Sequence, residues 1–101
     1  TCGYTLNHLL KMMEATTGYK ITIDEFSRAG ERIFTIKRLF NNRLGISRKD
    51  DRLPERINKP LPKGAKHQSP DLDQMLDEYY QLRGWDEEGK PKPEKLRELE
   101  L

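Results

Sequence analysis

The residues with the widest chemical range in this sequence are one cysteine and two histidines, Cys2, His8 and His67. Cys2 and His8 share an N-terminal segment, whereas His67 lies far along the chain. A zinc site needs four ligands, or three and an open position, so two ligands without a close third and fourth make a poor site. We therefore predict no metal site from these three residues.

Carboxylates are the other candidates for chemistry. They occur as the pair Asp50 and Asp51 and as the series Asp71, Asp73, Asp77 and Glu78. General acid–base catalysis needs one carboxylate in a desolvating pocket that shifts its pKa, whereas this spacing is typical of a solvated helix surface. The sequence also has no calcium loop, no phosphate-binding glycine loop and no Ser–His–Asp arrangement. We predict no catalytic, cofactor-binding or metal-binding residue in this chain.

Length and composition limit the chain to one small domain. Its 101 residues are 34% apolar and 36% charged, and the mean hydropathy is −0.96. The sequence contains no signal peptide and no run of about 18 apolar residues that could span a bilayer, and the single cysteine cannot form an internal disulfide. We therefore expect a cytoplasmic protein without a membrane partner.

The charge is unevenly distributed although the net charge is only +2. Residues 43–67 carry eight basic and three acidic groups, whereas residues 68–101 carry five and ten. These two regions can neutralise each other, so the basic region does not by itself require a nucleic acid or a membrane.

Periodicity and capping signals predict an all-α fold with three main helices and a short C-terminal one. Thr5 caps the first helix and Gly18 ends it. The capping box T22-I-D-E25 begins the second helix, over residues 23–44. The third starts at S69-P-D-L, with the proline in its first turn, and ends at Gly84, and the short helix covers Pro93 to Leu99. The second helix carries a stripe at helical spacing, formed by Phe26, Ala29, Ile33, Ile36 and Phe40.

A long irregular connection is predicted between the second and third helices, over residues 46–69. It is rich in proline and poor in apolar residues, so it is either disordered or packed on a surface from elsewhere. Its charged beginning, G45-I-S-R-K-D-D-R-L-P-E-R-I57, fits a solvated loop, a phosphate-binding patch or a salt-bridged tether.

Two features of the second helix predict contacts with other elements. Gly30 costs helix stability, so we expect it to allow another helix or backbone to approach closely. Arg28, Arg32 and Arg38 form either a solvated face or buried ion pairs with the carboxylates of the connection. The apolar faces that carry Phe26, Ile33, Phe40, Tyr79 and Trp85 are too many for 101 residues to cover.

Four sequence blocks in a fixed order resemble a known family. They are G18-Y with T22-I-D-E-F, G30-E-R-I-F-T-I-K-R-L-F-N41, S47-R-K-D-D-R-L-P-E-R56, and L72-D-Q-M-L-D-E-Y-Y-Q-L-R-G-W-D-E-E-G89. With the closing helix E94-K-L-R-E-L, these blocks resemble the C-terminal end of aldehyde ferredoxin oxidoreductases, the tungsten-pterin enzyme family. The resemblance covers nearly the whole chain, and it favours a salt-bridged tether for S47–R56.

The resemblance implies that residues 1–101 are the C-terminal helical domain of a larger enzyme. Family members oxidise aldehydes to carboxylic acids at tungsten held by two pterins, and pass electrons through a four-iron cluster to ferredoxin. The cofactor ligands are expected outside this chain. A cluster cysteine precedes the first helix of this domain in the family, but Cys2 lies several residues too close to that helix, so no ligand is assigned to it.

The resemblance therefore predicts an isolated chain without tungsten, iron or aldehyde-oxidising activity. Its partners would be the remaining domains of the parent enzyme, and its uncovered apolar faces predict self-association when it is isolated. The alternatives are a stand-alone helical protein-interaction module or a nucleic-acid-binding module. The second is disfavoured by the acidic character of the last long helix.

Overall fold

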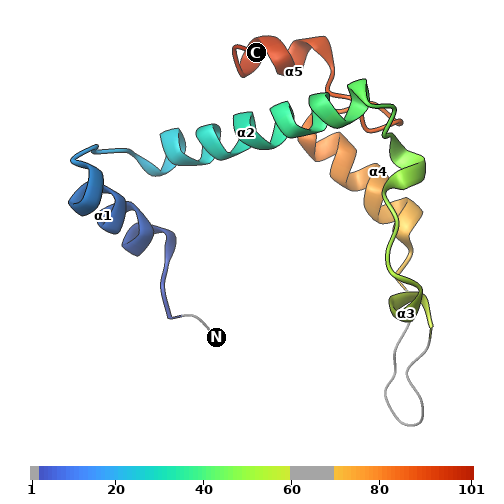
Figure 1. The fold of residues 1–101 in the computed structure, drawn as a ribbon, viewed down its shortest axis with the longest axis horizontal. Helices are drawn as coiled ribbons and strands as arrows, with labels where there is room; N and C mark the ends of the chain where they lie inside the picture. Colours follow the sequence, from blue (N-terminus) through green and yellow to red (C-terminus); the bar gives the residue numbers. More distant parts are fainter. Residues whose placement is uncertain (1–2, 60–69) are drawn as a thin grey trace.

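The computed structural model describes residues 3–59 and 70–101, which form a chain of helices (Figure 1). The elements follow in the order α1 (Leu6–Thr17), α2 (Ile23–Arg43), the 3-10 turn η1 (Arg48–Asp50), α3 (Glu55–Asn58), α4 (Leu72–Arg83) and α5 (Pro93–Glu98). Within the described ranges the backbone forms no strand beyond an isolated bridge between Trp85 and Pro91. The predicted all-α class is confirmed.

Local capping chemistry sets the ends of the helices. Thr22 accepts a hydrogen bond from the Glu25 amide, and the Glu25 carboxylate accepts one from the Thr22 amide at 2.8 Å, which is the predicted capping box. Because the folded state holds this carboxylate in hydrogen bonds to Thr22, the pKa of Glu25 is lowered. Gly18 and Gly84 end α1 and α4 in the left-handed conformation, as predicted.

The start of α4 and the connection before it differ from the prediction. Asp71 caps α4 by accepting a hydrogen bond from the Gln74 amide, so Pro70 precedes the cap and does not lie in the first turn. Two short helical segments, η1 and α3, lie in the stretch predicted to be irregular. Residues 60–69, the rest of that stretch, lie outside the described residues.

The core is small and lies at one end of the molecule, where α4, α5 and the C-terminal half of α2 meet (Figure 1). Its buried residues are Thr35, Arg38, Tyr80, Trp85, Gly89, Pro91 and Leu99. Trp85 follows the Gly84 cap, and its amide donates to the Tyr80 carbonyl at 2.8 Å, which turns the indole back onto the helix. By contrast, α1 lies at the far end of α2 and buries none of its residues.

The molecule is an open arch rather than a compact body (Figure 1). Its radius of gyration is 17.9 Å and it extends over 52 × 37 × 21 Å, whereas a compact domain of this length would have a radius of about 13 Å. No helix in the described part of the chain combines the length and the apolar character needed to cross a membrane.

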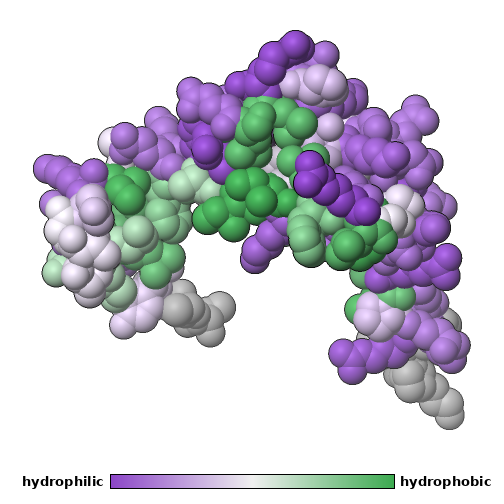
Figure 2. Space-filling model, turned by 45° about the horizontal axis from the view of Figure 1, so that its top comes forward, coloured by the Kyte–Doolittle hydropathy of each residue, from purple (hydrophilic) through white to green (hydrophobic). Residues whose placement is uncertain are grey.

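The predicted stripe of α2 faces away from this core. We call Phe26, Ala29, Ile33, Ile36 and Phe40 the α2 stripe; Ile33 is 56% exposed and Phe40 63%. Figure 2 shows hydrophobic residues gathered in the middle of the molecule and around its α1 end. The expectation that these apolar faces are not all covered is confirmed by Ile33 and Phe40, whereas Trp85 is buried.

Candidate functional site

The most highly connected part of the molecule is a cluster in which α2, η1, α4 and the turn after α4 meet. We call it the junction cluster, and it consists of Arg38, Asp51, Tyr80, Trp85 and Gly89. Arg38 is its centre, and its guanidinium donates from Nη1 and Nη2 to the two carboxylate oxygens of Asp51 at 2.8 and 2.6 Å. Its Nε donates to the Gly89 carbonyl at 2.7 Å. Bidentate pairing of this kind fixes the orientation of both groups.

Electrostatics in the junction cluster favour the ionised Asp51 and the neutral Tyr80. Burial by itself raises the pKa of Asp51, but hydrogen bonds from Arg38 and Tyr80 and the charges of Arg38 and Arg48 outweigh burial and lower it. Burial and the hydrogen bond to Asp51 raise the pKa of Tyr80 to about 12. The hydrogen bond to Asp51 likewise raises the pKa of Arg38. The folded state therefore favours a charged Arg38, an ionised Asp51 and a neutral Tyr80.

The aromatic residues enclose the Arg38 guanidinium. Its central carbon lies 5.3 Å from the centre of the Trp85 ring and 5.8 Å from that of Tyr80, both within cation–π range. Gly89 closes the other side with a φ of +74°, where a Cβ would lie 2.2 Å from Arg38 Nη2. Only glycine fits this position without a shift of the cluster.

The charged stretch 45–57 is a salt-bridged tether, as the resemblance favoured. Besides Asp51, it contributes Arg48, whose Nη1 lies 2.5 Å from Asp77 and whose Nη2 donates to the Asp73 carbonyl at 3.1 Å. The Arg48 amide also donates to the Glu88 carbonyl at 3.1 Å. These contacts hold the connection against α4 and the turn that follows it.

The other two arginines of α2 contact a different element. Arg28 donates to the Glu98 carbonyl at 2.8 Å, and Arg32 donates to the Leu99 carbonyl. Of the two alternatives, the buried ion pair with the connection holds for Arg38. Arg28 and Arg32 instead bind the end of α5, where they also lie 3.6 and 3.7 Å from the carboxylate of Glu100. Glu31 supports the same contact through an ion pair with Lys95 at 2.8 Å.

The structure describes only some of the candidate ligands from the sequence. Cys2 and His67 lie outside the described residues, and the His8 ring accepts a hydrogen bond from the Thr5 amide at the start of α1. Asp50 and Asp71 cap η1 and α4. Among residues 3–59 and 70–101, no three His, Cys, Asp or Glu side chains are grouped so that they could hold a metal ion.

Gly30 does not have the predicted role in this structure. A Cβ added at Gly30 would meet no atom within 4 Å, so no helix or backbone approaches it closely. The sequence pattern does not reveal Tyr80 and Gly89 as members of the junction cluster. Two sequence signals were available, namely the aromatic residues Tyr79, Tyr80 and Trp85 and the turn sequence that ends in Gly89. Neither signal indicates that the partner of these residues is Arg38.

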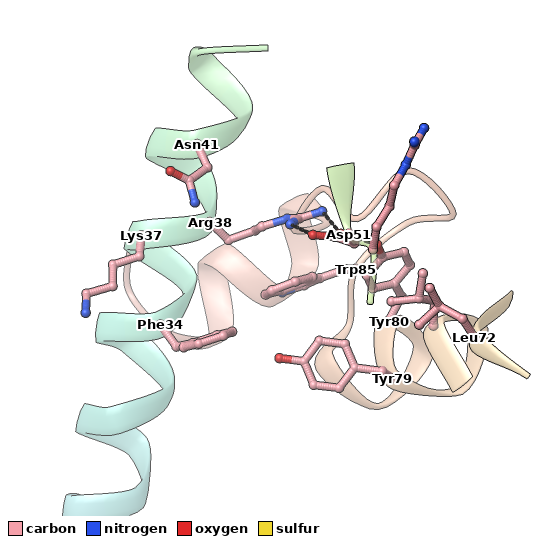
Figure 3. Close-up of a pocket in the computed structure, with 11 residues that line it drawn as sticks. Phe34, Lys37, Arg38, Asn41, Asp51, Leu72, Tyr79, Tyr80 and Trp85 are labelled. Carbon is pink, nitrogen blue, oxygen red and sulfur yellow. Dashed lines mark hydrogen bonds and ion pairs between the residues drawn. The ribbon is translucent and has the colours of Figure 1, made fainter. Parts of the chain in front are cut away.

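A partly open pocket of about 420 Å³ lies between α2 and α4 beside the junction cluster (Figure 3). Phe34 and Trp85 stack in parallel at its wall, with ring centres 6.2 Å apart. Tyr79 meets Trp85 edge-on at 5.7 Å. We call this space the aromatic pocket; its lining also includes Lys37, Arg38, Asn41, Asp51, Arg52, Leu72, Leu76 and Tyr80.

Comparison with known proteins identifies the family. The family model described as aldehyde ferredoxin oxidoreductase, domains 2 and 3, matches residues 1–101. The chain is 39% identical to the tungsten-containing aldehyde ferredoxin oxidoreductase of Pyrococcus furiosus, over 98% of this chain and 17% of that protein. It is 34% identical to the WOR-like subunit of an aliphatic sulfonate oxidoreductase from the same organism, over 90% and 16%.

A solved structure gives the same result. The chain matches the active-site complex BamBC of benzoyl coenzyme A reductase, solved with 1,5-dienoyl-CoA, with a TM-score of 0.71 and 31% identity over 97% of this chain and 14% of that one. The chain therefore belongs to the aldehyde ferredoxin oxidoreductase family and corresponds to its helical C-terminal part. It spans 17% of the length of the tungsten-containing relative from Pyrococcus furiosus.

Proposed function

We propose that residues 1–101 form the C-terminal structural domain of a larger cytoplasmic enzyme that oxidises aldehydes to carboxylic acids. In this proposal the rest of that enzyme holds a tungsten bis-pterin cofactor and a 4Fe-4S cluster and delivers electrons to ferredoxin. The present chain completes the fold of the enzyme and contributes no catalytic, cofactor-binding or metal-binding residue.

The observation that carries this proposal is the outward-facing α2 stripe. Two of its large side chains, Ile33 and Phe40, are more than half exposed. Apolar surface gathered in one area of a protein usually marks an interface. The open arch agrees with this interpretation, because its radius of gyration of 17.9 Å is well above that of a compact domain of the same length.

The names of the relatives support a structural role for this region. Proteins named for aldehyde, aliphatic sulfonate and benzoyl coenzyme A chemistry each contain a similar region of about 100 residues. A region shared by enzymes named for different substrates is not expected to determine substrate specificity. The proposal that the larger enzyme acts on aldehydes rests on the 39% identity to the aldehyde enzyme.

Nothing in these comparisons supports the alternatives of a stand-alone interaction module or a nucleic-acid-binding module. Two basic residues at the junction are already paired with carboxylates that a nucleic acid would displace. Arg48 of the connection is bound to Asp77, and Arg38 of α2 is bound to Asp51.

The experiment is a comparison of the full-length protein with the 101-residue chain, both purified without oxygen. We expect tungsten, iron and aldehyde-dependent reduction of a viologen dye in the full-length protein, and none of these in the chain alone. The proposal fails if the full-length protein lacks tungsten and aldehyde oxidation. It fails equally if the isolated chain binds stoichiometric tungsten or shows a broad iron–sulfur absorption band.

A further inference from the structure

The aromatic pocket has the shape and lining of a binding site. Its volume of about 420 Å³ lies in the range of ordinary ligand sites. Stacked Phe34 and Trp85 form one wall, and Tyr79 stands edge-on to Trp85 (Figure 3). Walls of this kind favour an apolar occupant, because burying apolar surface is the main driving force for filling such a space.

The charges around the aromatic pocket are unbalanced. Its lining contains three cations, Lys37, Arg38 and Arg52, and one carboxylate, Asp51, which gives a net charge of +2. Asp51 is already paired with Arg38. Among the described residues, neither Lys37 nor Arg52 has a carboxylate partner, although Arg52 Nε donates to the Lys49 carbonyl at 2.6 Å. The ammonium of Lys37 points away from the pocket in Figure 3, but exposed side chains reorient within nanoseconds.

An occupant that carries a carboxylate next to its apolar group would help to balance the net charge of +2 on the lining of the pocket.

We infer that the aromatic pocket receives a segment of the larger polypeptide, outside residues 1–101, that presents an apolar side chain next to a carboxylate. The inference rests on the proposed function, because the larger enzyme supplies that segment. It goes further by naming the receiving pocket, the chemistry of the occupant and two cations of the lining, Lys37 and Arg52. The apolar side chain enters between α2 and α4, and the carboxylate pairs with Lys37.

The test is carbodiimide cross-linking of the full-length protein followed by mass spectrometry, since this reagent joins a lysine directly to a carboxylate in contact with it. We expect Lys37 to be joined to an aspartate or glutamate outside the 101 residues. Lys90 is the internal control, because it is exposed and has no ion-pair partner in the described part of the chain. We also expect Lys37→Met with Arg52→Met to lower the melting temperature of the full-length protein, and Lys90→Met to leave it unchanged.

Three outcomes would overturn the inference. The first is that Lys37 reacts with an acylating reagent as fast as Lys90 does, and the second is that Lys37 is joined to a second copy of the protein in a mixed isotope-labelled sample. The third is that the double variant has the same melting temperature as the wild type. Each can occur in a protein that contains tungsten and oxidises aldehydes, so the pocket inference can fail while the proposed function holds. A full-length protein without tungsten would overturn the proposed function, and the cross-link would still decide the occupant of the pocket.

Discussion

Asp51 accepts hydrogen bonds from two side chains, Arg38 and Tyr80, and so connects α2 with α4 through the connection. Replacing it by asparagine removes the charge that neutralises a guanidinium only 9% exposed. We expect Asp51→Asn to lower the free energy of unfolding by about 3 kcal/mol, because a stranded buried charge is costly. Urea unfolding followed by the fluorescence of Trp85, the single tryptophan, measures this loss.

The matched control for this prediction is Asp24→Asn in the first turn of α2. Asp24 is exposed, and the loss of its interaction with the helix dipole should cost only about 0.5 kcal/mol. Equal effects of the two substitutions would contradict the central role given to Asp51.

The same cluster sets the pH range of stability. The pKa of Asp51 is lowered in the folded state, so its contribution is complete above the ordinary value of about 3.9 and is lost as the pH falls through the lowered value. The pKa of Tyr80 is raised to about 12, so its contribution is complete below about 10 and is lost as the pH rises from there toward 12. The free energy of unfolding, measured across this pH range, should fall at both the acid and the alkaline end. Asp51→Asn should make the decrease at the acid end smaller. Identical acid limbs for the two proteins would contradict the assignment.

Gly89 and Gly30 form a second pair of opposite predictions. Gly89→Ala places a methyl group 2.2 Å from Arg38 Nη2 at a φ of +74°, so we expect a loss of more than about 2 kcal/mol. Gly30→Ala fills open space on a helix and should stabilise the isolated chain by about 1 kcal/mol. The urea concentrations at the unfolding midpoints of both variants test these two predictions. If Gly89→Ala is as stable as the wild type, the junction cluster can rearrange around the added methyl group at little cost.

At the level of the elements, the sequence allowed the helices and their caps to be predicted because their signals are local. Thr22 and Glu25 are three residues apart, and Gly18 and Gly84 take a backbone conformation that the residue type itself favours. The segments η1 and α3 were missed because three or four residues carry too little periodicity for a pattern to be detected. Pro70 was misplaced because Asp71 is the better cap.

The contacts between elements were predicted less well. Periodicity located the α2 stripe, but it does not reveal which neighbour a stripe faces. The side of α2 that packs against the rest of the chain carries Glu31, Thr35 and Arg38, so polar side chains make this contact. A search for apolar residues at helical spacing therefore does not identify this side as the packed one. For the same reason, the sequence suggested that Arg38 pairs with the connection but did not separate it from Arg28 and Arg32.

At the level of the whole molecule, the α2 stripe predicts how the isolated chain behaves. Ile33 and Phe40 are exposed on a surface that a partner would cover, so the 101-residue chain should self-associate and bind a hydrophobic dye. Ile33→Glu with Phe40→Glu should shift the chain toward monomer in light scattering and reduce the dye fluorescence, because charges on the stripe cannot be buried in a contact between two copies.

Met75→Glu is the matched control, because Met75 is 55% exposed and lies on α4 rather than on the α2 stripe. This variant should associate as the wild type does. If the wild-type chain is monomeric and does not bind the dye, the stripe is not an interface. If Met75→Glu alone abolishes association, the contact lies on α4.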